Sequence, residues 1–90
     1  MSKKGLKAIL LSAESWCAGC RTMKPYFAEE CKRLGVRFEI LDVEENDGLN
    51  LSIKHTVRNV PTILFFEGNK LVGREVGNTS WENIKNYVND

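Results

Sequence analysis

The stretch Ser15–Arg21 (SWCAGCR) constrains the fold of this chain more than any other part of the sequence. The apolar run Ala8–Leu11 precedes it, and a segment with helical periodicity follows it. A Cys-x-x-Cys at a strand-to-helix junction puts the first cysteine at a helix N-terminus, where unpaired backbone N–H groups and the helix dipole stabilise a thiolate. The second cysteine lies about one helical turn later, within disulfide reach of the first. The motif therefore predicts dithiol–disulfide chemistry.

Size and composition narrow the protein class. Ninety residues predict one domain, covering 1–90, with a single core. Lys plus Arg number 13 against 12 Asp plus Glu, so the net charge of +1 gives no reason to expect nucleic acid or an anionic membrane as partner. The N-terminal apolar stretch is too short for a signal peptide, and no run is long enough to span a membrane. We therefore expect a cytoplasmic protein.

The cysteine count leaves two main readings of the motif. Three cysteines do not suit a secreted disulfide scaffold, so the pair is either redox-active or part of a metal site. Tetrahedral zinc needs four ligands, and Cys31 and His55 are the remaining candidates. Cys31 follows Cys20 by eleven residues on the same predicted helix, or roughly 16 Å at about 1.5 Å per residue. We expect no metal, an inert core thiol at Cys31 and a solvated His55.

The first half of the chain predicts a strand, a long helix and a second strand. The apolar block 6–12 fits a buried strand, and the helix runs from Cys17 or Ala18 to about Leu34, where Gly35 ends it. Pro25 should kink this helix. Its predicted inward stripe consists of Cys20, Met23, Phe27, Cys31 and Leu34. The alternating segment 36–43 predicts the second strand.

A polar connection and a short helix come next. Glu44 and Glu45 are expected in a solvated loop, and residues 49–55 predict a helix with Asp47 as its N-cap. Leu49 and Ile53 lie four residues apart and are predicted to share the inward face of that helix.

The last third predicts a hairpin and a final helix. Residues 62–66 form the most continuous β-prone run, the turn 67–70 follows, and 71–76 returns. A capping box at Thr79 and Glu82 predicts a helix start. The apolar face of this helix consists of Trp81, Ile84, Tyr87 and Val88. The element order β-α-β-α-β-β-α predicts an α/β domain whose mixed four-stranded sheet carries helices on both faces.

Five features in this order and spacing resemble the thioredoxin family over almost the whole chain. They are Trp16–Cys20, Pro25, Val60–Thr62, Gly68 and Val76–Gly77. The resemblance implies a thioredoxin fold with three helices around the four-stranded sheet. It also implies an enzyme, a protein-disulfide reductase with no bound cofactor other than its own redox-active disulfide.

The resemblance also implies residue roles. Cys17 would be the attacking thiolate and Cys20 the buried resolving thiol, and Pro61 would follow a cis peptide bond. The groove that binds the partner's backbone would be lined by Trp16, Ala18, Gly19, Val60, Pro61 and Gly77. The implied partners are disulfide-containing proteins and an NADPH-dependent flavoprotein reductase that regenerates the dithiol. The protein is expected to be a monomer that takes part in electron transport and cell redox homeostasis.

The sequence departs from the family pattern at several positions. Few residues precede the motif, and Ala18–Gly19 replaces the usual Gly-Pro. Leu11 and Ile40 stand where the family carries a buried aspartate and its lysine partner. That pair helps to deprotonate the resolving cysteine, so Glu14 and Glu39 are the candidate substitutes here.

Two alternatives to the leading interpretation remain. One is a glutaredoxin-like electron donor recharged by glutathione or a dedicated reductase. Asn78–Ser80 lacks the second glycine and the acidic residue that hold glutathione in that family, and Trp16 also favours a thioredoxin. The other is a non-catalytic binding module with the same fold, which would not need its thiols.

Overall fold

The computed structural model describes residues 5–77 and Tyr87. In chain order its elements are β1 (Leu6–Ser12), α1 (Ala18–Leu34), β2 (Arg37–Asp42), α2 (Asn46–Lys54), β3 (Thr62–Glu67) and β4 (Lys70–Val76). The strands form one sheet in the order β2-β1-β3-β4. The β1–β2 pair is parallel, and the β1–β3 and β3–β4 pairs are antiparallel. The predicted mixed four-stranded sheet is confirmed. The predicted final helix lies outside the described residues, Tyr87 excepted.

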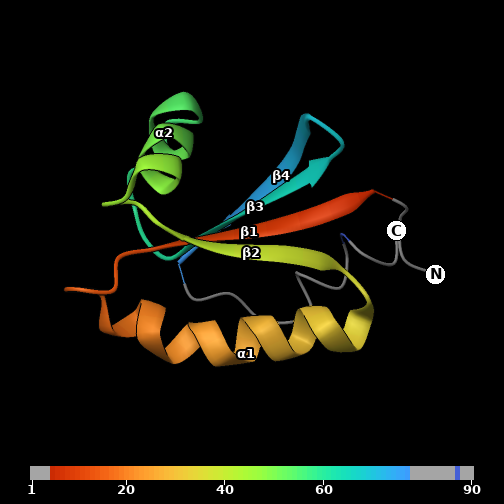
Figure 1. The fold of residues 1–90 in the computed structure, drawn as a ribbon, viewed down its shortest axis with the longest axis horizontal. Helices are drawn as coiled ribbons and strands as arrows, with labels where there is room; N and C mark the ends of the chain where they lie inside the picture. Colours follow the sequence, from red (N-terminus) through yellow and green to blue (C-terminus); the bar gives the residue numbers. More distant parts are fainter. Residues whose placement is uncertain (1–4, 78–86, 88–90) are drawn as a thin grey trace.

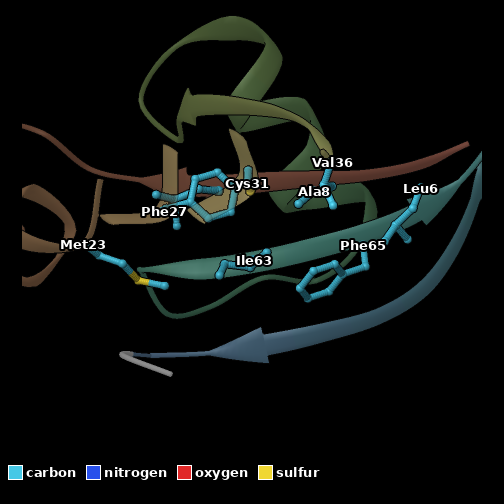
Figure 2. Packing of buried hydrophobic residues seen from close by; sticks show 9 residues of the cluster. Leu6, Ala8, Met23, Phe27, Cys31, Val36, Ile63 and Phe65 are labelled. Atoms are coloured by element: carbon cyan, nitrogen blue, oxygen red, sulfur yellow. The ribbon is translucent and has the colours of Figure 1, made fainter. Parts of the chain in front are cut away.

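The two described helices cover opposite faces of the sheet (Figure 1). Side chains alternate across a strand, so β1 supplies Ala8 and Leu10 to one face and Ile9 and Leu11 to the other. The cluster beneath α1 consists of Leu6, Ala8, Leu10, Met23, Phe27, Cys31, Val36, Ile63 and Phe65 (Figure 2). The cluster on the α2 side consists of Ile9, Leu11, Leu64 and Phe66. Both inner strands are thus apolar on both faces, as the sequence predicted.

The long helix α1 follows its sequence pattern closely. Its buried residues are Cys20, Met23, Phe27 and Cys31, spaced three or four apart. Gly35 ends the helix in the left-handed region at φ 72°, and Lys32 and Arg33 occupy the last turn. Pro25 lies inside the helix, and the kink expected there stays a prediction. In the described part of the chain, no helix has the length and apolar character needed to cross a bilayer.

The short helix α2 differs from its prediction. It begins at Asn46 after Glu45, which makes no side-chain cap, so the predicted cap at Asp47 is wrong. Leu49 and Ile53 are 44% and 69% exposed, so their predicted inward position is wrong as well.

The reason for the error on α2 is a close backbone contact at Gly48. A Cβ atom at Gly48 would collide with the backbone of Asp42 at the end of β2. Gly48 is the buried residue of the helix, and Leu51, three residues on, packs against the cluster on the α2 side. This contact fixes the rotation of the helix, and that rotation turns Leu49 and Ile53 outward.

Tyr87 shows where the chain returns to the sheet. Its ring stacks on that of Phe65, with centroids 4.1 Å apart and planes 8° from parallel. It packs against the cluster beneath α1, which agrees with its place in the predicted apolar face of the final helix. Gly73 on β4 lies directly against this ring, and a Cβ there would clash with it.

Candidate active site

The two motif cysteines lie at the N-terminus of α1. Cys17 is the N-cap residue, with extended backbone angles, and Cys20 is in the first turn. A disulfide joins them, and their Cα atoms are 5.2 Å apart. Cys20 is fully buried, whereas Cys17 retains 8% exposure. Of the two cysteines, only Cys17 therefore retains any surface exposed to solvent.

Backbone groups stabilise negative charge on the Cys17 sulfur. The Cys20 N–H donates to Cys17 Sγ at 3.1 Å, in the position where a capping side chain accepts. The unpaired N–H groups of the first turn and the helix dipole act on the same atom. When the disulfide opens, these groups favour the Cys17 thiolate over the thiol.

The loop before Cys17 is anchored at both of its ends. The Ala13 carbonyl accepts hydrogen bonds from the Trp16 and Cys17 N–H groups, and Ala13 itself is buried against both cysteines. The Glu14 N–H donates to the Asp42 carboxylate at 3.2 Å. The loop is thereby joined to the C-terminal end of β2, which adjoins β1 in the sheet.

A second anchor of this loop was missed in the sequence. The Ser15 hydroxyl donates to the Glu44 carboxylate at 2.6 Å, and the Glu44 N–H donates to Asp42 at 2.8 Å. Glu44 is exposed, as expected, but it also holds the active-site loop. No sequence signal predicts this pair, because the two residues are 29 positions apart and meet only through the β1–β2 register.

The segment before β3 forms the opposite side of the site. The Val60–Pro61 peptide bond is cis. The Val60 carbonyl oxygen lies 3.8 Å from Cys17 Sγ, and the Val60 side chain packs against the cluster of Ala13, Cys17 and Cys20. The Pro61 carbonyl accepts a hydrogen bond from the Gly77 N–H at 2.7 Å. Gly77 adopts φ 80°, which favours glycine.

These contacts connect most of the sequence-predicted site residues. Cys17, Cys20, Val60, Pro61 and Gly77 form one continuous set through the disulfide, the contact between Cys17 Sγ and the Val60 carbonyl, and the Gly77–Pro61 hydrogen bond. Trp16 and Ala18 flank Cys17 and are exposed, the indole at 63%, while Gly19 is half-buried. The arrangement places Cys17, the more exposed of the two cysteines, beside an apolar, solvent-facing indole.

The positions that replace the family's buried charged pair are apolar in the structure as well. Leu11 is fully buried on the α2 side of the sheet, and Ile40 packs against the cluster beneath α1. The two candidate substitutes each have a cationic partner: Glu14 pairs with Lys24, and Glu39 pairs with Lys7 at 3.1 Å. Both carboxylates are thus held in ion pairs.

Three other residues bear on the sequence predictions: Ser12, Cys31 and His55. The Ser12 hydroxyl is buried and has no hydrogen-bond partner among the described residues, which the sequence did not predict. Cys31 is a buried free cysteine, and desolvation raises the pKa of its thiol to about 12, with Glu30 adding to the effect. His55, predicted to be solvated, is instead half-buried with its ring against that of Phe66.

Over residues 5–77 and Tyr87, no three His, Cys, Asp or Glu side chains gather as a metal site would require.

Comparisons with known proteins give a consistent result. A sequence model described as Thioredoxin matches residues 3–90. A thioredoxin of Buchnera aphidicola subsp. Baizongia pistaciae is 26% identical over 84 residues, which covers 92% of this chain and 77% of that protein. A thioredoxin H-type of Ricinus communis is 35% identical over 75 residues, covering 82% of this chain and 61% of that protein. The X-ray structure of Fasciola hepatica thioredoxin superposes with a TM-score of 0.80 at 27% identity, covering 94% of this chain and 80% of that one.

Proposed function

The chain belongs to the thioredoxin family, and we propose that it reduces disulfide bonds in partner proteins with Cys17 as the attacking thiolate and Cys20 as the resolving thiol. Its activity class, thiol–disulfide oxidoreduction, follows from the family and from the paired cysteines. One observation carries the assignment of the two roles. Cys17 is the cysteine that retains some exposure, and its Sγ accepts a backbone N–H, whereas Cys20 is fully buried.

The reaction proceeds in two exchanges. The Cys17 thiolate attacks one sulfur of the partner disulfide, forming a mixed disulfide and releasing the first partner thiolate. Cys20 then loses its proton and attacks Cys17 Sγ, which restores the Cys17–Cys20 disulfide and releases the second partner thiolate. The protein gives up two electrons, the partner gains them, and both partner thiolates take up protons. The disulfide form is therefore the product state of the reduction.

The groove residues act on the partner's backbone. Trp16, Ala18, Gly19, Val60, Pro61 and Gly77 are proposed to contact an extended segment around the partner disulfide. The position of the Val60 carbonyl, 3.8 Å from Cys17 Sγ, supports this, because a strand paired there would carry its sulfur to the attacking atom. Pro61 has no N–H of its own and leaves the pairing to Val60.

We further propose a cytoplasmic location, a single domain over residues 1–90, and recharging by an NADPH-dependent flavoprotein reductase. The free thiol of Cys31 in the core suits a reducing compartment. Turnover with NADPH and a thioredoxin reductase, compared with turnover on glutathione and glutathione reductase, tests the electron source. Faster turnover on glutathione would favour the glutaredoxin-like alternative.

Substitution of each cysteine tests the roles. We expect Cys17→Ser to lower dithiothreitol-driven insulin reduction to the uncatalysed rate, because no other exposed thiolate is available. Cys20→Ser should instead accumulate a mixed disulfide that dithiothreitol releases, since the resolving step is lost. Cys31→Ser is the matched control and should retain activity. Full insulin-reducing activity in Cys17→Ser would contradict the assignment of Cys17 as the nucleophile.

A further inference from the structure

A hollow of about 260 Å³ lies on the α2 side of the sheet, away from the cysteines. It is lined by Lys7, Ile9, Leu51, Lys54, His55, Phe66, Gly68 and Asn69. Lys7 is at the start of β1, and the active-site loop follows the end of that strand. Five residue steps at about 3.3 Å put the two sites roughly 17 Å apart along the strand. A ligand in the hollow would leave the disulfide accessible.

The floor of the hollow is apolar. Ile9 and Phe66 belong to the buried cluster on the α2 side, and Leu51 packs against it. The imidazole of His55 meets the Phe66 ring edge to face, with centroids 5.5 Å apart. Aromatic and aliphatic groups bury favourably against such a surface.

The rim of the hollow has an excess of positive charge. The charged groups on this side are four cations and two anions: Lys7 from β1, Arg37 and Glu39 from β2, Asp47 and Lys54 from α2, and Arg74 from β4. Glu39 pairs with Lys7, and Lys54 has no ion-pair partner in the described part of the chain. The Arg74 guanidinium donates to the His55 carbonyl at 2.6 Å, which holds a second cation close to the ring.

The pKa of His55 reflects this electrostatic environment. Burial lowers the pKa of its imidazole, and the positive charges of Lys54 and Arg74 lower it further. The positive charges of Lys54 and Arg74 therefore act at the hollow itself, where they disfavour protonation of His55. An anion bound there would reverse the effect and favour the imidazolium form.

We propose that this hollow binds a small organic anion, a carboxylate or phosphate carried on a compact aromatic or aliphatic group. The apolar floor takes the body of the ligand, and Lys54 and His55 at the rim take its charge. The volume is just below the range usual for drug-sized ligands, so the body is about the size of one ring. The proposal does not depend on the redox chemistry of Cys17 and Cys20.

The test uses the single histidine of the chain as a reporter in proton NMR. Phenyl phosphate and benzoate are the anionic probes, and benzyl alcohol is the neutral control of similar shape. We expect both anions to raise the pKa of His55 and benzyl alcohol to leave it unchanged. The better of the two anions identifies the preferred head group. Binding should tighten as the pH falls through the His55 pKa, because the protonated ring attracts the anion.

Two charge-removing variants separate a site from general attraction. Lys54→Gln should weaken phenyl phosphate binding about two- to fivefold, as expected for a partly exposed charge pair. Lys32→Gln removes the same charge from the exposed end of α1 and should leave binding unchanged. Equal losses in both variants, or equally tight binding of inorganic phosphate, would overturn the proposal. Cys17→Ser should bind the probes as the wild type does. The binding test therefore succeeds or fails independently of the redox roles proposed for Cys17 and Cys20.

Discussion

The two helices that flank the sheet are positioned by different physical effects. Helix α1 buries four side chains along one stripe and ends in a left-handed glycine. In helix α2 the one buried residue is Gly48, and two of its large apolar side chains face solvent. One helix is held by apolar burial, whereas the other is oriented by a close backbone contact.

This difference explains why the same sequence rule succeeded for α1 and failed for α2. A helical stripe predicts the inward face when side-chain burial dominates the free energy of docking. At Gly48 the absence of a side chain is what permits contact with the Asp42 backbone. Leu51 is then the apolar residue of α2 that packs on the sheet, with His55 one turn further on the same face.

The largest expected effect is on the α1 side. Phe27 is fully buried and meets Phe38 edge to face, with centroids 5.7 Å apart. Phe27→Ala removes this contact and leaves a cavity, so we expect a loss of about 3–5 kcal/mol in the free energy of unfolding. Urea denaturation followed by circular dichroism measures it.

A milder substitution at the same position keeps the test usable if Phe27→Ala does not fold. Phe27→Leu keeps most of the buried volume and should cost about 1–2 kcal/mol. If Phe27→Ala lowered the free energy of unfolding by less than Phe27→Leu, burial would not be what holds α1 to the sheet.

An intermediate effect is expected at Gly48. Gly48→Ala brings a Cβ against the Asp42 backbone, and the overpacking should cost about 1–3 kcal/mol. The higher helix propensity of alanine offsets only about 1 kcal/mol of this cost. Asp42 also accepts the Glu14 N–H, so insulin reduction should slow as the active-site loop shifts. Urea denaturation and the insulin assay measure the two effects.

The control for this substitution lies two residues away. Asn50 is exposed on the same helix, so Asn50→Ala gains propensity without a new contact and should be neutral or slightly stabilising. Equal stability of the Gly48→Ala and Asn50→Ala variants would show that the backbone contact does not orient α2.

Most of the fold could be predicted because its signals are local. The strand bounds of β1, the extent of α1 and the glycine at its end follow from periodicity and capping. The start of α2 could not be predicted in the same way, because Glu45 precedes it without a capping side-chain bond and Asp47 lies within it. Its orientation also depends on Asp42, a residue of another element.

The features of the candidate site likewise fall into those encoded by local sequence and those that depend on long-range packing. The cysteine pair and its helix N-terminus are encoded within a few residues, and the spacing alone gives their geometry. The Ser15–Glu44 bond and the buried Ser12 hydroxyl arise from the packing of segments distant in sequence. Leu11, which stands where the family carries a buried aspartate, is fully buried in the structure.

The smallest expected effect concerns the apolar residues that were assigned to the wrong face of α2. Leu49→Gln and Ile53→Gln alter side chains that are 44% and 69% exposed, so each should change the free energy of unfolding by less than about 0.5 kcal/mol. Leu51→Gln is the matched comparison on the inward side and should cost about 1–3 kcal/mol, because it carries an amide into an apolar contact. Urea denaturation of the three variants ranks them directly. If Ile53→Gln cost as much as Leu51→Gln, side-chain burial rather than the glycine contact would orient α2, and the contrast between the two helices would no longer hold.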